Sequence, residues 1–200
     1  MKKGLFILII LAVAVACNNP GQKKEQQEPE AMEQETRQPN TLTQAEVEEG
    51  WKLLFDGNST EHWRGYNKEE FPGGGEVVAG TLHVIGSGRG EAGGGGDIIT
   101  KNKFGNFELS LEWKVSKGGN SGIFYLAQEI PGEPIWKNSP EMQILDNINH
   151  PDAKLGIQGN RQAGALYDLI PAEPQTAKPA GEWNHVKILV YKGTVVHWMN

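Results

Sequence analysis

The chain has 200 residues, and its 25 acidic and 19 basic side chains give a net charge of −6, which excludes a broad basic surface for nucleic acid phosphates. Its only cysteine is Cys17, which excludes an intramolecular disulfide and a cysteine-rich metal site. The 26 glycines stand in short clusters between apolar runs, a pattern typical of the turns of an all-β protein.

Residues 1–17 have the parts of an export signal: a charged start, an apolar run over residues 5–15 and small residues before Cys17. The apolar run is shorter than the roughly 20 residues that a spanning helix needs. Residues 14–17 read Ala-Val-Ala-Cys and resemble a lipobox, whose cysteine becomes the lipidated first residue of a mature bacterial lipoprotein. We therefore expect a lipid anchor at Cys17, with ordinary secretion as the alternative.

Residues 18–42 are expected to form a disordered tether. They are rich in Gln, Glu and Lys and contain no aromatic residue, so they cannot bury enough apolar surface to offset the entropy of ordering. We expect the tether to hold a folded domain of residues 43–200 away from a membrane, at the periplasmic or outer-membrane face of the bacterial cell envelope.

The domain is predicted to begin with a short helix and to continue as strands. Thr43 and Glu46 fit a capping box, and the helix should end at Gly50. Apolar and polar residues alternate over residues 107–115, which predicts a strand with one buried face. Further strands are predicted over residues 52–55, 76–79, 81–85, 97–100, 121–127, 141–145, 165–170, 186–191 and 194–199.

Many short strands separated by Gly and Pro favour an all-β sandwich of two antiparallel sheets. The last strand, over residues 194–199, has no later strand to pair with. An uncovered apolar strand is an aggregation hazard that native sheets avoid, so we expect the chain to be incomplete beyond Asn200.

The run Glu-Met-Gln-Ile-Leu-Asp over residues 141–146 is the most informative candidate site. Side chains two apart on a strand share a face at about 6.6–6.8 Å, so Glu141 and Gln143 should line one surface. Asp146 would join them only through a bulge or at the strand end, and His150 follows in the next loop. These groups suit proton transfer, although a solvated polar face on an edge strand is an equal alternative.

Three further residues are candidates for binding a sugar. Asn120 follows two glycines and could point its amide into a cleft, although a simple turn is the interpretation that the residues alone favour. Trp136 lies in a proline-rich loop and should be exposed, and Tyr167 offers a second flat face on which a sugar ring could stack. Most large aromatic residues of a β-sandwich belong to its core, so these two assignments rest on position.

The E-x-Q-x-x-D run of Glu141, Gln143 and Asp146 resembles the E-x-D-x-x-E strand of laminarinase-like retaining glycosidases, which have a concanavalin-like jelly roll. A retaining mechanism requires two carboxyl groups about 5–5.5 Å apart. The amide of Gln143 can neither attack nor transfer a proton, so ordinary retaining hydrolysis is disfavoured unless Asp146 substitutes.

Several motifs in order, from about residue 49 to the end, resemble the 3-keto-disaccharide hydrolase domain family. They occupy residues 50–57, 62–63, 96–100, 107–109, 119–124, 141–146, 164–167 and 178–184. The resemblance implies a concanavalin A-like jelly-roll sandwich that cleaves glycosides already oxidised to a ketone at C3. A C3 ketone acidifies the C2 proton, so a base can remove it and expel the C1 substituent, after which water adds to the enone.

This chemistry needs a general base, an acid for the leaving oxygen and donors for the enolate, and it does not need paired carboxylates. The resemblance implies Glu141 as the base or acid, with Gln143 and Asn120 holding the sugar or the enolate. Asp146 and His150 would then be the second proton-transfer group or ligands to a divalent metal ion. A glycosidase for unoxidised glucan and a non-catalytic carbohydrate-binding module at the cell surface stay open as alternatives.

Replacement of Cys17 by Ser tests the lipid anchor. We expect cells fed with a labelled fatty acid to label the wild-type protein and not the Cys17→Ser variant, because the thioether that attaches the lipid requires the thiol. Equal labelling of both proteins, or no labelling of the wild type, contradicts the prediction.

Overall fold

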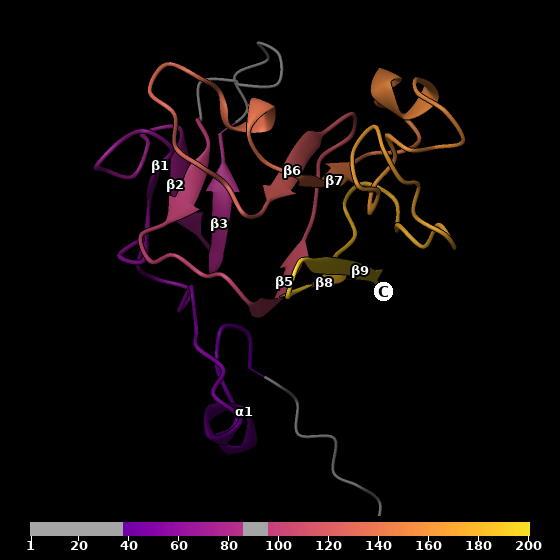
Figure 1. Ribbon diagram of the computed structural model, residues 1–200. Helices are drawn as coiled ribbons and strands as arrows, with labels where there is room; N and C mark the ends of the chain where they lie inside the picture. The colour runs from indigo at the N-terminus through magenta and orange to yellow at the C-terminus, as the bar shows by residue number, and fades with distance from the viewer. Residues whose placement is uncertain (1–37, 86–95) are drawn as a thin grey trace, which may run out of the picture. The chain divides into compact units, whose positions relative to one another are not determined.

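The computed structural model describes residues 38–85 and 96–200, which are coloured in Figure 1. The predicted export signal, Cys17 and residues 18–37 of the tether lie outside the described residues, so lipidation and the predicted domain limits stay predictions. Within the described ranges, no helix has the length and apolar character needed to cross a membrane.

The described residues form short strands, one α-helix and two 3₁₀-helices. The helix α1 spans Gln44–Glu48, and the 3₁₀-helices η1 and η2 span Ile135–Lys137 and Pro151–Lys154. The strands are β1 Trp63–Gly65, β2 Gly75–Val78, β3 Thr81–Val84, β4 Ile98–Thr100, β5 Phe107–Trp113, β6 Asn120–Phe124, β7 Glu141–Leu145, β8 Asn184–Tyr191 and β9 Thr194–Met199.

The predicted capping box at the start of α1 is confirmed. The side chain of Thr43 accepts a hydrogen bond from the backbone N–H of Glu46, and the backbone N–H of Thr43 donates to Oε2 of Glu46 at 2.8 Å. The two residues thereby satisfy two backbone donors at a helix start that would otherwise lack partners.

The strands pair in antiparallel ladders, which confirms the all-β prediction. The ladders are β1–β4, β2–β3, β5–β8–β9 and β6–β7, and the last pair lies side by side in Figure 1. On its other edge β7 meets the segment 164–167, where Gln143 donates to the carbonyl of Ala165 at 3.0 Å and Met142 forms a bridge with Leu166. The strand β7 is therefore hydrogen-bonded on both edges.

Two strand predictions are wrong, and one short strand was missed. Residues 165–170 form turns with isolated bridges, because Gly164 and Asp168 have φ angles of 84° and 60° and the left-handed backbone interrupts an extended run. Residues 52–55 are not a strand, and the carbonyl of Leu54 accepts from the indole of Trp63 at 2.7 Å instead of from a ladder. Trp63 itself begins β1, which periodicity did not indicate because the strand has three residues.

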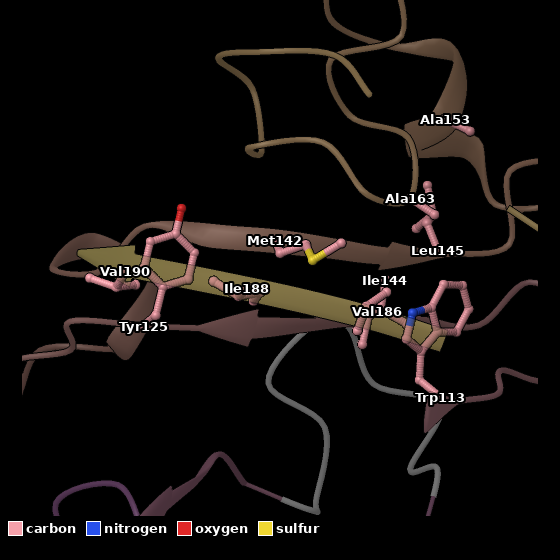
Figure 2. Close-up of a cluster of buried hydrophobic side chains, with 10 residues drawn as sticks. All are labelled: Trp113, Tyr125, Met142, Ile144, Leu145, Ala153, Ala163, Val186, Ile188 and Val190. Carbon is pink, nitrogen blue, oxygen red and sulfur yellow. The ribbon is translucent and has the colours of Figure 1, made fainter. Parts of the chain in front are cut away.

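The core consists of buried side chains from β5, β7 and β8, together with Tyr125, Ala153 and Ala163 outside the strands. Met142 and Ile144 of β7 lie with Ile188 of β8 in this cluster, and Ile188 is fully buried. Figure 2 shows Leu145 on the other side of β7, pointing toward Ala163. Apolar residues of β7 are thus buried on one face along its length and on the second face at its C-terminal end.

Truncation of Ile188 tests the position of the core. We expect Ile188→Ala to lower the free energy of unfolding by about 2–5 kcal/mol, because it removes buried methyl groups and leaves a cavity. The matched control is Ile157→Ala, whose side chain is 73% exposed and whose loss should change stability by less than about 0.5 kcal/mol. Equal losses for the two variants, measured by urea denaturation, would contradict the core described here.

Candidate functional site

The alternation of side chains along β7 separates the core from the candidate site. Met142 and Ile144 face the core, and Glu141 and Gln143 point to the opposite face, as the sequence predicted. Gln143 is only 2% exposed, and its Oε1 accepts from the backbone N–H of Ile144 at 3.1 Å, whereas Glu141 is half-buried. On this face the accessible functional group of β7 is therefore the carboxylate of Glu141.

Gly122 makes room for that carboxylate. In the β6–β7 ladder Gly122 pairs with Gln143, and Phe124 pairs with Glu141. The side chain of Glu141 leans over Gly122, so that a β-carbon at position 122 would overlap its carboxylate oxygen and lie 2.6 Å from its Cδ. The absence of a side chain at 122 thus leaves the space that the Glu141 carboxylate occupies.

Tyr167 lies beside Glu141 on the other edge of β7. The backbone N–H of Tyr167 donates to the carbonyl of Glu141 at 3.0 Å, and the Met142–Leu166 bridge sets the two residues opposite each other. Residues that are opposite in an antiparallel pair have β-carbons about 4.5–5.5 Å apart on one face. Tyr167 and Glu141 are therefore neighbours in the candidate site.

The hydroxyl of Tyr167 leads to a charged cluster that the sequence analysis missed. This hydroxyl donates to Oδ2 of Asp152 at 2.8 Å, and the guanidinium of Arg161 donates to the other oxygen of Asp152 at 3.1 Å. Arg161 also pairs with Asp168, which lowers the pKa of that carboxyl, and the two carboxylates raise the pKa of the guanidinium. These residues lie in irregular loops, where no periodicity could have indicated their meeting.

Asp146 lies at the opposite end of β7 from Glu141. A strand rises about 3.3 Å per residue, so five residues separate their α-carbons by roughly 16 Å. The Asp146 carboxylate accepts from the backbone N–H groups of Gly118 (2.7 Å) and Ile148, and from both the backbone and the side-chain amide of Asn149. These donors, led by the N–H of Gly118, lower the pKa of Asp146 to about 2, which favours a structural role.

His150 also lies beyond the C-terminal end of β7. It is the N-cap of η2, and its Nδ1 accepts from the backbone N–H of Asp152 at 3.2 Å. Among the described residues, no three His, Cys, Asp or Glu side chains gather closely enough to hold a metal ion. Because both oxygens of Asp146 already accept hydrogen bonds, the predicted pair of Asp146 and His150 does not fit a divalent metal site.

The remaining predicted residues have distinct positions. Asn120 pairs with Leu145, which is four residues and about 13 Å from Glu141 along the ladder, so Asn120 lies near the Asp146 end. Trp136 is 57% exposed in η1, as expected, and the ammonium group of Lys137 lies 5.8 Å from its ring centroid. The structure therefore groups Glu141, Gln143 and Tyr167 and places Asn120 and Asp146 at the other end of β7. His150 contacts the backbone of Asp152, whose carboxylate accepts from the Tyr167 hydroxyl.

A hollow of about 540 Å³ lies elsewhere in the described region. Its lining includes Lys52, His62 and Lys103 and none of the predicted site residues.

A pH series tests the structural role of Asp146. The folded-state pKa is lowered to about 2, so the carboxylate stabilises the fold fully above its unfolded pKa of about 4, and this contribution is lost as the pH falls from about 4 to about 2. We expect Asp146→Asn to lower the free energy of unfolding at pH 7, and the difference from wild type to shrink below pH 4. The control Glu112→Gln, on an exposed side chain of β5, should show little difference at any pH. A difference for Asp146→Asn that is independent of pH would contradict this account.

Comparison with known proteins supplies the family. The sequence model of the 3-keto-alpha-glucoside-1,2-lyase-like domain matches residues 50–200. A curated 3-keto-disaccharide hydrolase from Bacteroides thetaiotaomicron is 49% identical over 223 residues, which cover 100% of this chain and 77% of that protein.

Solved structures from Parabacteroides distasonis, described as candidate glycosyl hydrolases, have the same fold. One is 32% identical with a TM-score of 0.72 and covers 82% of this chain and 74% of its own. Another is 27% identical with a TM-score of 0.53 and covers 74% of this chain and 60% of its own. The predicted jelly-roll fold and the predicted class of enzyme, a glycoside hydrolase, are confirmed. The chain belongs to the family of 3-keto-alpha-glucoside-1,2-lyase-like domains.

Proposed function

We propose that this protein cleaves the glycosidic bond of 3-keto-disaccharides or related 3-keto-glycosides, with Glu141 as the general base. The observation that carries the proposal is the half-buried Glu141 carboxylate over Gly122, next to Tyr167 and with an amide at the following position of the same face. The family and the curated relative, a 3-keto-disaccharide hydrolase, support the substrate class.

The reaction needs one base at C2. Glu141 removes the C2 proton, and the electron pair of the C–H bond moves toward the C3 ketone as an enolate. The enolate then expels the oxygen at C1, which takes up a proton and leaves as the alcohol of the second sugar. Water adds to C1 of the resulting enone and a proton returns to C2, so the net reaction is hydrolysis.

The arrangement of the carboxylates supports this route over ordinary retaining hydrolysis. The retaining mechanism uses two carboxyl groups about 5–5.5 Å apart. Gln143 provides an amide on the same face as Glu141, and Asp146 is roughly 16 Å away along β7. Asp152 is close to Tyr167, but its carboxylate is held by the Tyr167 hydroxyl and by Arg161.

The different exposure of Gln143, Tyr167 and Trp136 suggests different roles for these residues in the proposed reaction. Gln143, at 2% exposed, supports the face behind Glu141, because too little of its amide reaches the surface to hold a sugar. We assign stacking on a sugar to the ring of Tyr167, which adjoins Glu141, and to the exposed ring of Trp136. Under this proposal the export signal and Cys17 display the enzyme at the cell envelope, where it meets its carbohydrate substrate.

Replacement of Glu141 by Gln tests the proposed base. We expect the turnover of a 3-keto-α-glucosyl disaccharide to fall by about 10²–10⁴-fold, the usual contribution of a general base, because the amide keeps the shape but cannot accept a proton. Glu112→Gln is the matched control and should keep wild-type turnover, since its side chain is exposed on β5.

The same assay includes the unoxidised disaccharide, in which C2 carries no acidic proton. Wild-type enzyme should cleave the 3-keto form and leave the unoxidised form intact. Turnover of the unoxidised sugar at a comparable rate would favour a plain glucan glycosidase, and Glu141→Gln activity within threefold of wild type would remove Glu141 from the mechanism.

A further inference from the structure

One arginine joins three parts of the loop that follows β7. Arg161 donates through Nε and Nη2 to the two carboxylate oxygens of Asp168 at 2.7 and 2.9 Å, and through Nη1 to Asp152 at 3.1 Å. Its guanidinium carbon lies 5.4 Å from the centroid of the Tyr167 ring. The planar fork of arginine allows these directed contacts at once, which the point charge of a lysine does not.

The pairing with Asp168 holds a turn of unusual backbone geometry. Asp168 has a φ of 60°, in the left-handed region that few residues other than glycine adopt. Its backbone N–H donates to the carbonyl of Asn160 at 2.9 Å, and its carboxylate accepts hydrogen bonds from Arg161. Asp168, which follows Tyr167, is therefore held both by its backbone N–H and by its carboxylate.

Tyr167 is in turn fixed at three points. Its backbone N–H donates to the carbonyl of Glu141, its hydroxyl donates to Asp152, and the guanidinium of Arg161 lies over its ring. The hydroxyl is thus engaged with a carboxylate that Arg161 neutralises, and the guanidinium lies over the ring, so a sugar would meet the ring from the side away from Arg161. A ring with a fixed orientation binds a sugar without the entropic cost of ordering it first.

We infer that Arg161 is a positioning residue of the active site, which holds the Tyr167 ring as a rigid wall beside Glu141 so that the substrate presents C2 to that carboxylate. The inference rests on the proposed function and extends it to the loop of residues 152–168. Arg161 itself acts through Asp152, Asp168 and Tyr167, and its loss should affect substrate binding as well as turnover.

The experiment compares Arg161→Met, Arg161→Lys and Asp168→Asn with the wild type. With a 3-keto-α-glucosyl disaccharide, we expect Arg161→Met to raise KM at least tenfold and lower kcat, and we expect the other two variants to have intermediate values. Amide hydrogen exchange at Tyr167 should become at least tenfold faster in Arg161→Met, because this N–H reports the bond to Glu141 directly. Lys187→Met is the control, because it breaks the 2.7 Å ion pair with Glu108 between β5 and β8 and should change neither KM nor exchange at Tyr167.

The outcomes separate this inference from the proposed function. If the wild-type enzyme is active and folded Arg161→Met has unchanged KM and unchanged amide exchange at Tyr167, the role of Arg161 is overturned and the proposed function is not. A lower Tm of Arg161→Met without a change in KM has the same consequence. If Arg161→Met does not fold, unchanged KM in Arg161→Lys and Asp168→Asn overturns it equally. Wild-type protein that neither cleaves nor binds the 3-keto-disaccharide refutes the proposed function and the positioning role together.

Discussion

The alternation of side chains along β7 decides which residues enter the core and which face the candidate site. Met142 and Ile144 are buried in the hydrophobic core with residues of β5 and β8, and this burial fixes the register of β7 against β6. A slip of one residue would send every side chain to the opposite face, placing Glu141 in the core and Met142 in the site. The position of the proposed base is therefore set by hydrophobic packing on the far side of the same strand, and Gly122 supplies the space that the carboxylate occupies.

The carboxylates in and after β7 have different surroundings and different roles. At the C-terminal end, Asp146 accepts several hydrogen bonds and stabilises the turn that follows the strand. In the loops that follow β7, Asp152 and Asp168 are neutralised by Arg161. Glu141 is half-exposed at the start of β7, beside Tyr167, and is the carboxylate to which the proposed function assigns proton transfer.

Much of the fold could be predicted because it follows from local patterns. The strand β7 has the predicted bounds, and the capping box of Thr43 and Glu46 forms as expected, since both depend on residues close in sequence. The site was predicted only in part. Periodicity put Glu141 and Gln143 on one face, but it could not show that Gln143 is covered or that Asp146 closes a turn. The meeting of Asp152, Arg161 and Tyr167 depends on left-handed turns in an irregular loop, and nothing in the spacing of these residues encodes it.

A crystal structure of the Glu141→Gln variant with a 3-keto-disaccharide bound would show whether the face of β7 that bears Glu141 receives the sugar. The account predicts that C2 of the oxidised ring lies within about 3.5 Å of the side chain at position 141, close to the distance of a reactive contact, with the ring against Tyr167. A sugar bound in the hollow bounded by Lys52, His62 and Lys103, with none at β7, would contradict it.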